Sequence, residues 1–156
     1  LAHRNQILIF QSAASLLESF VTVLVVAKVL WLLATVFGYD PAFKKVLAVA
    51  AYARLLSVLL RQGMVSITAT AIADLSAFDP KNALATNPAF FLHPVSPVWS
   101  KLLLSLDLIT FLNIALLGAG LMKIAPGLSR QAAYGIVLIP WGTYVGITML
   151  VPALAG

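Results

Sequence analysis

Five ionisable residues lie inside stretches that are otherwise apolar, and they are the first candidates for chemistry in this sequence. They are Glu18, Lys28, Arg54, Arg61 and Asp107. An ionised side chain near the centre of a bilayer costs at least ~2.5–3.5 kcal/mol on insertion scales, so each needs a partner, a water path or a reach to the surface. The types of residue therefore suggest charge pairing, movement of an ion or proton, or contact with lipid.

The composition places these residues in a membrane protein. Of 156 residues, 62% are hydrophobic and 10% are charged, whereas soluble domains have roughly 45–50% apolar and about 25% charged residues. The length allows one domain, residues 1–156. Ten Lys and Arg residues against five Asp and Glu give a net charge of +5. The cations are scattered, which favours contact with lipid phosphates over nucleic acid. The absence of cysteine excludes disulfides, thiolate metal sites and cysteine nucleophiles.

The apolar stretches predict an all-α fold, a polytopic bundle of transmembrane helices with four spans and with five as the alternative. About 20 apolar residues cross the ~30 Å hydrocarbon core. We expect the second span to be one helix with an irregularity near Gly63. Four prolines and several aromatic residues predict an interfacial loop at 74–100. Because the chain begins with Leu1 and ends after an apolar run, we expect a fragment or a processed chain. The predicted spans are about 16–37, 46–73, 101–122 and 131–151.

The depths of the charged residues predict one interhelical pair. At about 1.5 Å per residue, Asp107 and Arg61 lie roughly 10–12 Å below the same face, and Glu18 reaches that level if the first helix begins early. We hypothesise a structural pair of Arg61 with Asp107, with Glu18 as a second carboxylate; an ion pathway and an unpaired Arg61 are the alternatives. Lys28 and Arg54 share a level roughly 12–14 Å from the opposite face, which no carboxylate of the chain reaches. We expect contact with lipid or a partner chain there.

Other polar and small residues suggest packing more than catalysis. Gly142 and Gly146 form a GxxxG pair in the last span, so we expect a close helix contact there, and we expect Gly118 and Gly120 to allow one in the third span. The same glycines suit either packing within the chain or self-association. Asn113 is expected to hydrogen-bond a neighbouring helix.

Catalytic and metal-binding motifs are missing from the sequence. It has no phosphate-binding loop, no H-E-x-x-H and no evident serine–histidine–acid set. We therefore predict no enzyme activity, no metal and no resident cofactor, but bound lipid. If the chain belonged to a pigment or haem complex, His93 would be the first candidate axial ligand.

The order of several segments resembles a known family. Residues 43–52, FKKVLAVAAY, are similar to the stretch that opens the second helix in the Yip family, the Ypt/Rab-interacting membrane proteins, especially its bacterial branch. Residues 86–88, 103–110 and 128–133 resemble that branch's loop, third-helix and last-loop signatures. The resemblance covers roughly 16–151. It implies a multi-span bundle without known catalysis, located in the bacterial inner membrane.

The sequence also departs from the family. Arg54-Leu55 stands where members often carry a proline, and the acidic segment that precedes the first span of eukaryotic members is missing. Binding of Rab-type GTPases is therefore not expected.

Three functions are compatible with these features. The first is a non-enzymatic Yip-like protein that organises membranes or binds partner proteins. The second is a small accessory subunit of a larger membrane complex, for example an energy-transducing one, that contacts lipid or pigment through Lys28, Arg54 or His93. The third, ranked last, is a transporter or channel that uses the level of Arg61 and Asp107.

Overall fold

The chain is helical throughout the part that the structure describes. The structure is a computed structural model that describes residues 2–71, 86–92 and 96–155, with side chains for 17–68, 86–92, 96 and 98–150. No strand occurs in these ranges, so the predicted all-α class is confirmed for them. The helices are α1 (Ala2–Val36), α2 (Phe43–Ala71), α3 (Pro88–Leu92), α4 (Pro97–Ser105), α5 (Leu108–Ile124) and α6 (Arg130–Ala155).

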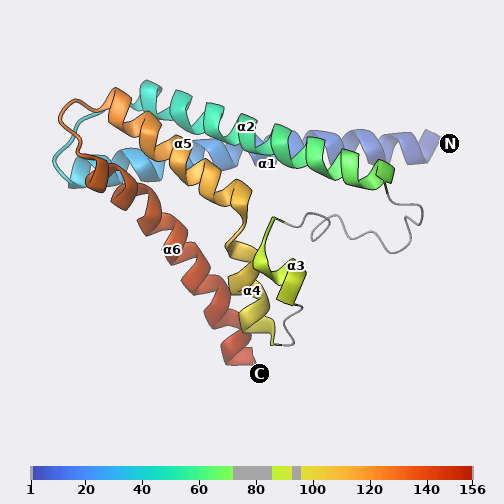
Figure 1. The fold of residues 1–156 in the computed structure, drawn as a ribbon. Helices are drawn as coiled ribbons and strands as arrows, with labels where there is room; N and C mark the ends of the chain where they lie inside the picture. The colour runs from blue at the N-terminus through green and yellow to red at the C-terminus, as the bar shows by residue number, and fades with distance from the viewer. Residues whose placement is uncertain (1, 72–85, 93–95, 156) are drawn as a thin grey trace.

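Four long helices make the body of the fold (Figure 1). α2 packs against α1 and α5, and α6 packs against α5 and, less extensively, α1. The turn between α1 and α2 and the turn between α5 and α6 lie at the same end of the molecule. From that end α6 diverges from α1 and α2, and the short helices α4 and α3 lie beside its C-terminal part.

The turn after α1 shows how the local sequence ends this helix. Gly38 has a φ of +84°, a conformation that glycine adopts without steric cost. The amide of Tyr39 donates to the carbonyl of Ala34 at 2.9 Å, which satisfies one of the last carbonyls of the helix. The indole Nε1 of Trp31 donates to the carbonyl of Pro41 at 3.1 Å. The chain is therefore fixed as it turns back into α2.

The core lies near this end and contains many small residues. A Cβ added at Gly118 would lie 2.5 Å from Cε1 of Tyr134, and one added at Gly120 would overlap the side chain of Val49. These glycines let α5 approach α6 and α2 closely, as small residues do in membrane bundles. The buried cluster includes Ala27, Leu30 and Ala34 of α1, Val46, Ala50 and Ala53 of α2, Ile114, Leu117 and Leu121 of α5, and Ala133, Ile136 and Val137 of α6.

The close contact expected at the other pair of glycines is absent. A Cβ added at Gly142 or Gly146 would meet nothing within 4 Å, and both residues are exposed. The expected contact is therefore not made within the described part of the chain, where the face of α6 that carries these residues points away from the neighbouring helices. Contact with a second copy stays a prediction.

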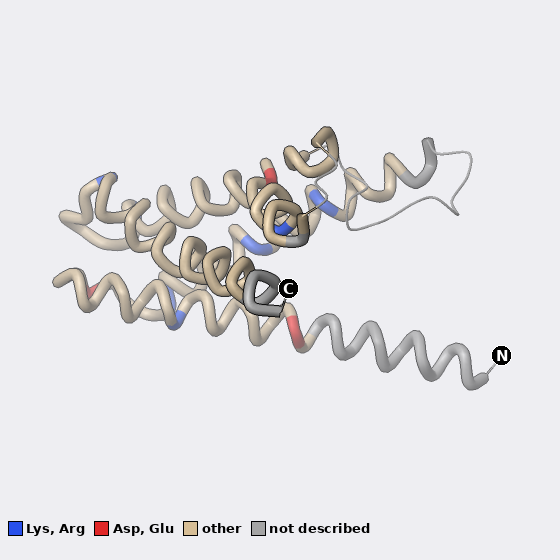
Figure 2. The backbone as a smooth tube through the Cα atoms, turned by 90° about the horizontal axis from the view of Figure 1, so that it is seen from below, with Lys and Arg blue, Asp and Glu red and all other residues tan. Residues whose placement is uncertain are grey.

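The structure supports fewer membrane spans than the four predicted. Two helical stretches, Leu17–Val36 of α1 and Arg130–Leu150 of α6, are long and apolar enough to cross a membrane. A third results if α4 and α5, bent by 51°, together make one span. α2 is not among these candidates, and its apolar run is interrupted by Arg54, Arg61 and Gln62. Charges are sparse along the described helices, as Figure 2 shows, which is consistent with a membrane location.

Three further expectations are corrected. α2 is an uninterrupted helix through Gly63, with no irregularity there. The predicted span 101–122 is not one helix, because it breaks at Leu106 and Asp107. The predicted loop 74–100 contains α3 and the start of α4 among its described residues. These two helices begin at prolines, Pro88 and Pro97, which suit the first position of a helix because proline has no N–H to satisfy.

Replacement of Gly120 by alanine should destabilise the bundle. The new methyl group overlaps the β-branched Val49 side chain, whose single preferred rotamer in a helix leaves it little room to move. We expect Gly120→Ala to lower the free energy of unfolding by about 1–3 kcal/mol, measured by thermal unfolding in detergent.

Gly146→Ala is the matched control, because its methyl group enters open space in a helix. It should cause no loss of stability, since alanine is the better helix former. Equal destabilisation by the two variants would show that the contact of α5 with α2 is not close.

Candidate functional site

Two non-helical residues, Leu106 and Asp107, interrupt the backbone between α4 and α5. α4 ends at Ser105, Leu106 has φ −84° and ψ 45°, and Asp107 is extended, with φ −83° and ψ 136°. α5 starts at Leu108, and the two helices are inclined by 51°. Non-helical backbone at membrane depth is tolerated where the protein satisfies its polar groups.

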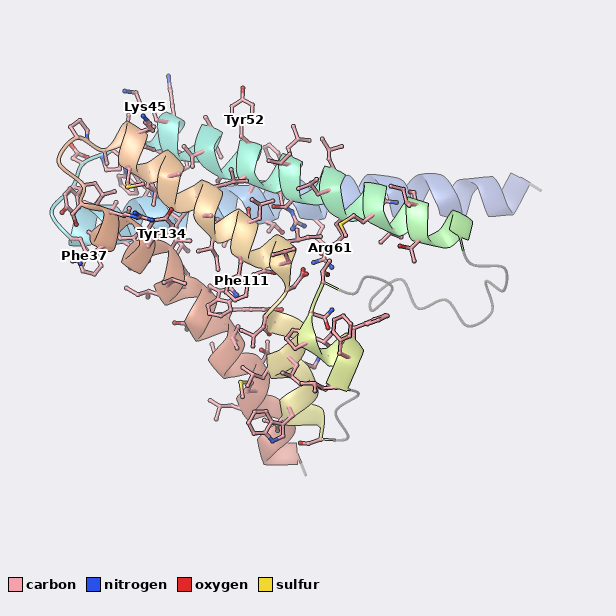
Figure 3. All side chains as sticks on the ribbon, in the orientation of Figure 1. Phe37, Lys45, Tyr52, Arg61, Phe111 and Tyr134 are labelled. Carbon is pink, nitrogen blue, oxygen red and sulfur yellow. The ribbon has the colours of Figure 1, made fainter. Side chains whose placement is uncertain are left out.

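Asp107 holds this break through both carboxylate oxygens. Its Oδ1 accepts a hydrogen bond from the amide of Ile109 at 3.4 Å, so Asp107 is the N-cap residue of α5. Its Oδ2 accepts from Nη2 of Arg61 on α2 at 2.5 Å. Figure 3 shows Arg61 pointing from α2 toward the start of α5. One side chain thus joins the cap of a half-helix to a neighbouring helix.

The segment before α3 covers the same break. The amide of Leu108 donates to the carbonyl of Thr86 at 2.9 Å, across residues far apart in the sequence. The next residue, Asn87, is 7% exposed, and its Oδ1 accepts from the amide of Phe90 at 3.1 Å at the start of α3. The amide of Leu108, at the first position of α5, has no partner within the helix, and the carbonyl of Thr86 accepts its hydrogen bond instead.

The ion pair is asymmetric in its exposure. The side chain of Arg61 is 51% exposed, whereas that of Asp107 is 6% exposed. The carboxylate has therefore lost most of its solvation and depends on its hydrogen-bond donors, while the guanidinium still reaches the surroundings. The contact hypothesised from the sequence is present, and its role as a structural pair stays a prediction.

Glu18 does not join this pair. It is exposed on α1, and the ion pair of Arg61 with Asp107 is the only one among the described residues. The expected cluster of Arg61 with two carboxylates is therefore wrong. The physical reason is helix placement: α1 packs chiefly against α2 and has no extensive contact with α4 or α5, so a matching depth along its axis does not bring the exposed Glu18 beside the break.

The two cations near the other face have different surroundings. Nζ of Lys28 lies 4.1 Å from the centroid of the Trp31 ring and 5.6 Å from that of Phe43, which gives its charge an aromatic partner within the chain. Arg54 is exposed, and within the described part of the chain it makes no ion pair or hydrogen bond through its side chain. Contact of either residue with lipid or a partner chain stays a prediction.

The remaining predicted residues do not gather into one site. His93 lies outside the described residues. The expected hydrogen bond of Asn113 to a neighbouring helix is missing for its Oδ1, which is buried without a partner. Among the described residues, no group of three or more His, Asp or Glu side chains is placed to hold a metal ion.

Sequence reasoning missed the break itself and the contribution of Thr86 and Asn87. One signal was available, because aspartate is a preferred N-cap residue and Asp107 is followed by a strongly apolar helical stretch. The contact of Thr86 with the break had no signal, since it joins segments far apart in the sequence.

Comparisons with protein-family models, with curated proteins and with solved structures found no match to the chain. The resemblance to the Yip family therefore stays a prediction.

Replacement of Asp107 by asparagine separates the ion pair from the helix cap. Asparagine caps a helix about as well as aspartate, so Asp107→Asn should cost stability through the lost charge alone. We expect about 1–2 kcal/mol, less than for a fully buried pair, because Arg61 is half exposed. The measurement is unfolding in detergent.

A double-mutant cycle with Arg61→Gln provides the control. If the two side chains interact, Asp107→Asn should cost little once Arg61 is already replaced. Strictly additive losses would show that the pair contributes nothing to the stability of the bundle.

Proposed function

We propose that the chain is a non-enzymatic integral membrane protein of four spans that organises membrane or binds partner proteins. The observation that supports it is the outer surface: large apolar side chains stay uncovered along helices long enough to cross a bilayer. Exposed apolar surface on this scale marks a membrane or protein interaction surface. On the two helices that qualify, such residues include Leu17, Phe20, Val21 and Val25 of α1 and Ile147 and Leu150 of α6. α2 carries further exposed apolar side chains, among them Leu55, Leu56 and Leu59.

The four-span arrangement is supported by length and by the position of the turns. α2 has 29 residues, about 44 Å at 1.5 Å per residue, which exceeds the ~30 Å hydrocarbon core. The two turns, at 37–42 and 125–129, lie at one end of the molecule, as an up-and-down bundle requires. The Yip-type function and the bacterial inner membrane rest on the sequence resemblance.

Arg54 favours a second candidate, an accessory subunit of a larger membrane complex. Arg54 is an exposed cation in the middle of an apolar helix, next to the exposed side chain of Leu55. A cation inside a span usually pairs with another group or faces water. That group would be either a carboxylate on a partner helix or the phosphate of a lipid.

Labelling of single cysteines tests the four-span topology, because the chain has no cysteine of its own. Asp40, Pro126 and Ser96 are all exposed and lie outside the long helices. With four spans, Asp40→Cys and Pro126→Cys should react with an impermeant maleimide from one side of sealed vesicles, and Ser96→Cys from the other. If α2 does not cross and α4 and α5 together do, Asp40→Cys and Pro126→Cys should instead react from opposite sides. If only α1 and α6 cross, all three should react from one side.

Photocrosslinking tests partner binding near Arg54. A photoreactive residue at Leu55, which is 55% exposed, should crosslink a discrete protein in native membranes. The matched control is Leu32, 47% exposed on α1, one turn beyond Lys28. Because the charge of Lys28 already has an aromatic partner, Leu32 should crosslink lipid only. Lipid adducts alone at both positions would contradict the partner-binding reading at Arg54.

A further inference from the structure

A cavity of about 370 Å³ lies where α1, α5 and α6 meet. Its wall is mainly apolar and comes from all three helices, with Val29 of α1, Leu117 of α5 and Trp141 of α6 among its members. Its size falls within the ~300–1,000 Å³ of small-molecule sites. The described residues that line it include no charged side chain. Such a wall suits an uncharged, apolar molecule.

Asn113 is the polar residue of this wall that stands out. Its Oδ1 is buried and has no hydrogen-bond partner among the described residues. A buried carbonyl oxygen without a donor costs free energy, and such atoms are rare in native proteins. Rotation about the Cβ–Cγ bond exchanges the oxygen with the NH₂ group of the same side chain. Asn113 thus lines the cavity and carries an oxygen that no described residue satisfies.

The backbone of α6 departs from regular helical hydrogen bonding at the wall of the same cavity. Pro140 also lines it and has no N–H. The carbonyl of Ile136, four residues earlier in α6, therefore receives no helical hydrogen bond from position 140. The wall of the cavity thus includes one side-chain oxygen without a donor among the described residues, Oδ1 of Asn113, and one helical position without an N–H, Pro140.

We propose that this cavity binds an uncharged lipid-like molecule that carries a hydroxyl group. The apolar body of the molecule fills the space between α1, α5 and α6. The hydroxyl donates to the carboxamide oxygen of Asn113 and accepts from its NH₂ group. A charged headgroup is disfavoured, because the lining offers no opposite charge. A plain hydrocarbon is disfavoured as well, because it would leave the Asn113 oxygen without a donor.

The test uses Trp141 as the reporter, since it lines the cavity. Two probes are added to the full chain in lipid nanodiscs: a long-chain alcohol brominated in mid-chain, and the alkane brominated at the same carbon. Bromine quenches the fluorescence of nearby indole rings. The quenching measured for the unmodified chain minus that measured for the Trp141→Phe variant is the quenching of Trp141 itself. We expect the alcohol to saturate this signal at about three- to tenfold lower concentration in the bilayer than the alkane, as one hydrogen bond provides.

Three variants test whether the preference for the alcohol over the alkane comes from Asn113. Asn113→Leu should abolish the preference for the alcohol. Thr143→Val, the control, should keep the preference, because the Thr143 hydroxyl is exposed on α6 and donates to the carbonyl of Ile139. Val29→Phe fills the cavity and should weaken the quenching by both probes, which tests the site even if Asn113→Leu fails to fold. Equal saturation by the two probes in the unmodified chain, or a preference that survives Asn113→Leu, would overturn the proposal.

Discussion

The hydrogen bonds of Asp107 are the interaction on which the arrangement of the helices around the break depends. One carboxylate oxygen caps α5 through the amide of Ile109, and the other receives a donor from Arg61 on α2. Without these donors, a carboxylate that is 6% exposed would be buried with an unsatisfied charge, which is one of the most expensive states in a protein interior. The same residue therefore caps α5 directly after the end of α4 and ties this break to α2.

The two ends of the molecule are held together in different ways. At the turn end, small side chains and glycines bring the helices close, and Trp31 fixes the chain by its hydrogen bond to Pro41. Toward the other end α6 diverges from α1 and α2, and the contacts of α4 with α6 take over. The break at Asp107 makes this change of direction feasible, because one straight helix could not follow both α2 and the C-terminal part of α6.

The cavity between α1, α5 and α6 is related to this divergence. It lies beside the core, where α1 and α6 both face α5 and apolar side chains from the three helices surround it. Asn113 and Pro140 are ordinary residues in membrane helices when a neighbouring group supplies the missing hydrogen bonds. In this fold the described residues supply no hydrogen-bond donor to the Oδ1 of Asn113. A molecule in the cavity that Asn113 lines is the proposed source of that donor.

Local sequence determined the helical class, the apolar character of the long helices and the need of Arg61 and Asp107 for partners. These properties depend on composition, on the periodicity of apolar residues and on the cost of charge in hydrocarbon, all of which can be read along the chain. The tertiary structure alone decided that Asp107 breaks a helix, that Glu18 stays apart, that Gly118 but not Gly142 is closely packed, and that Asn113 lacks a donor. The reason is that depth along a helix follows from residue number, whereas the direction in which each face points is set by packing between helices.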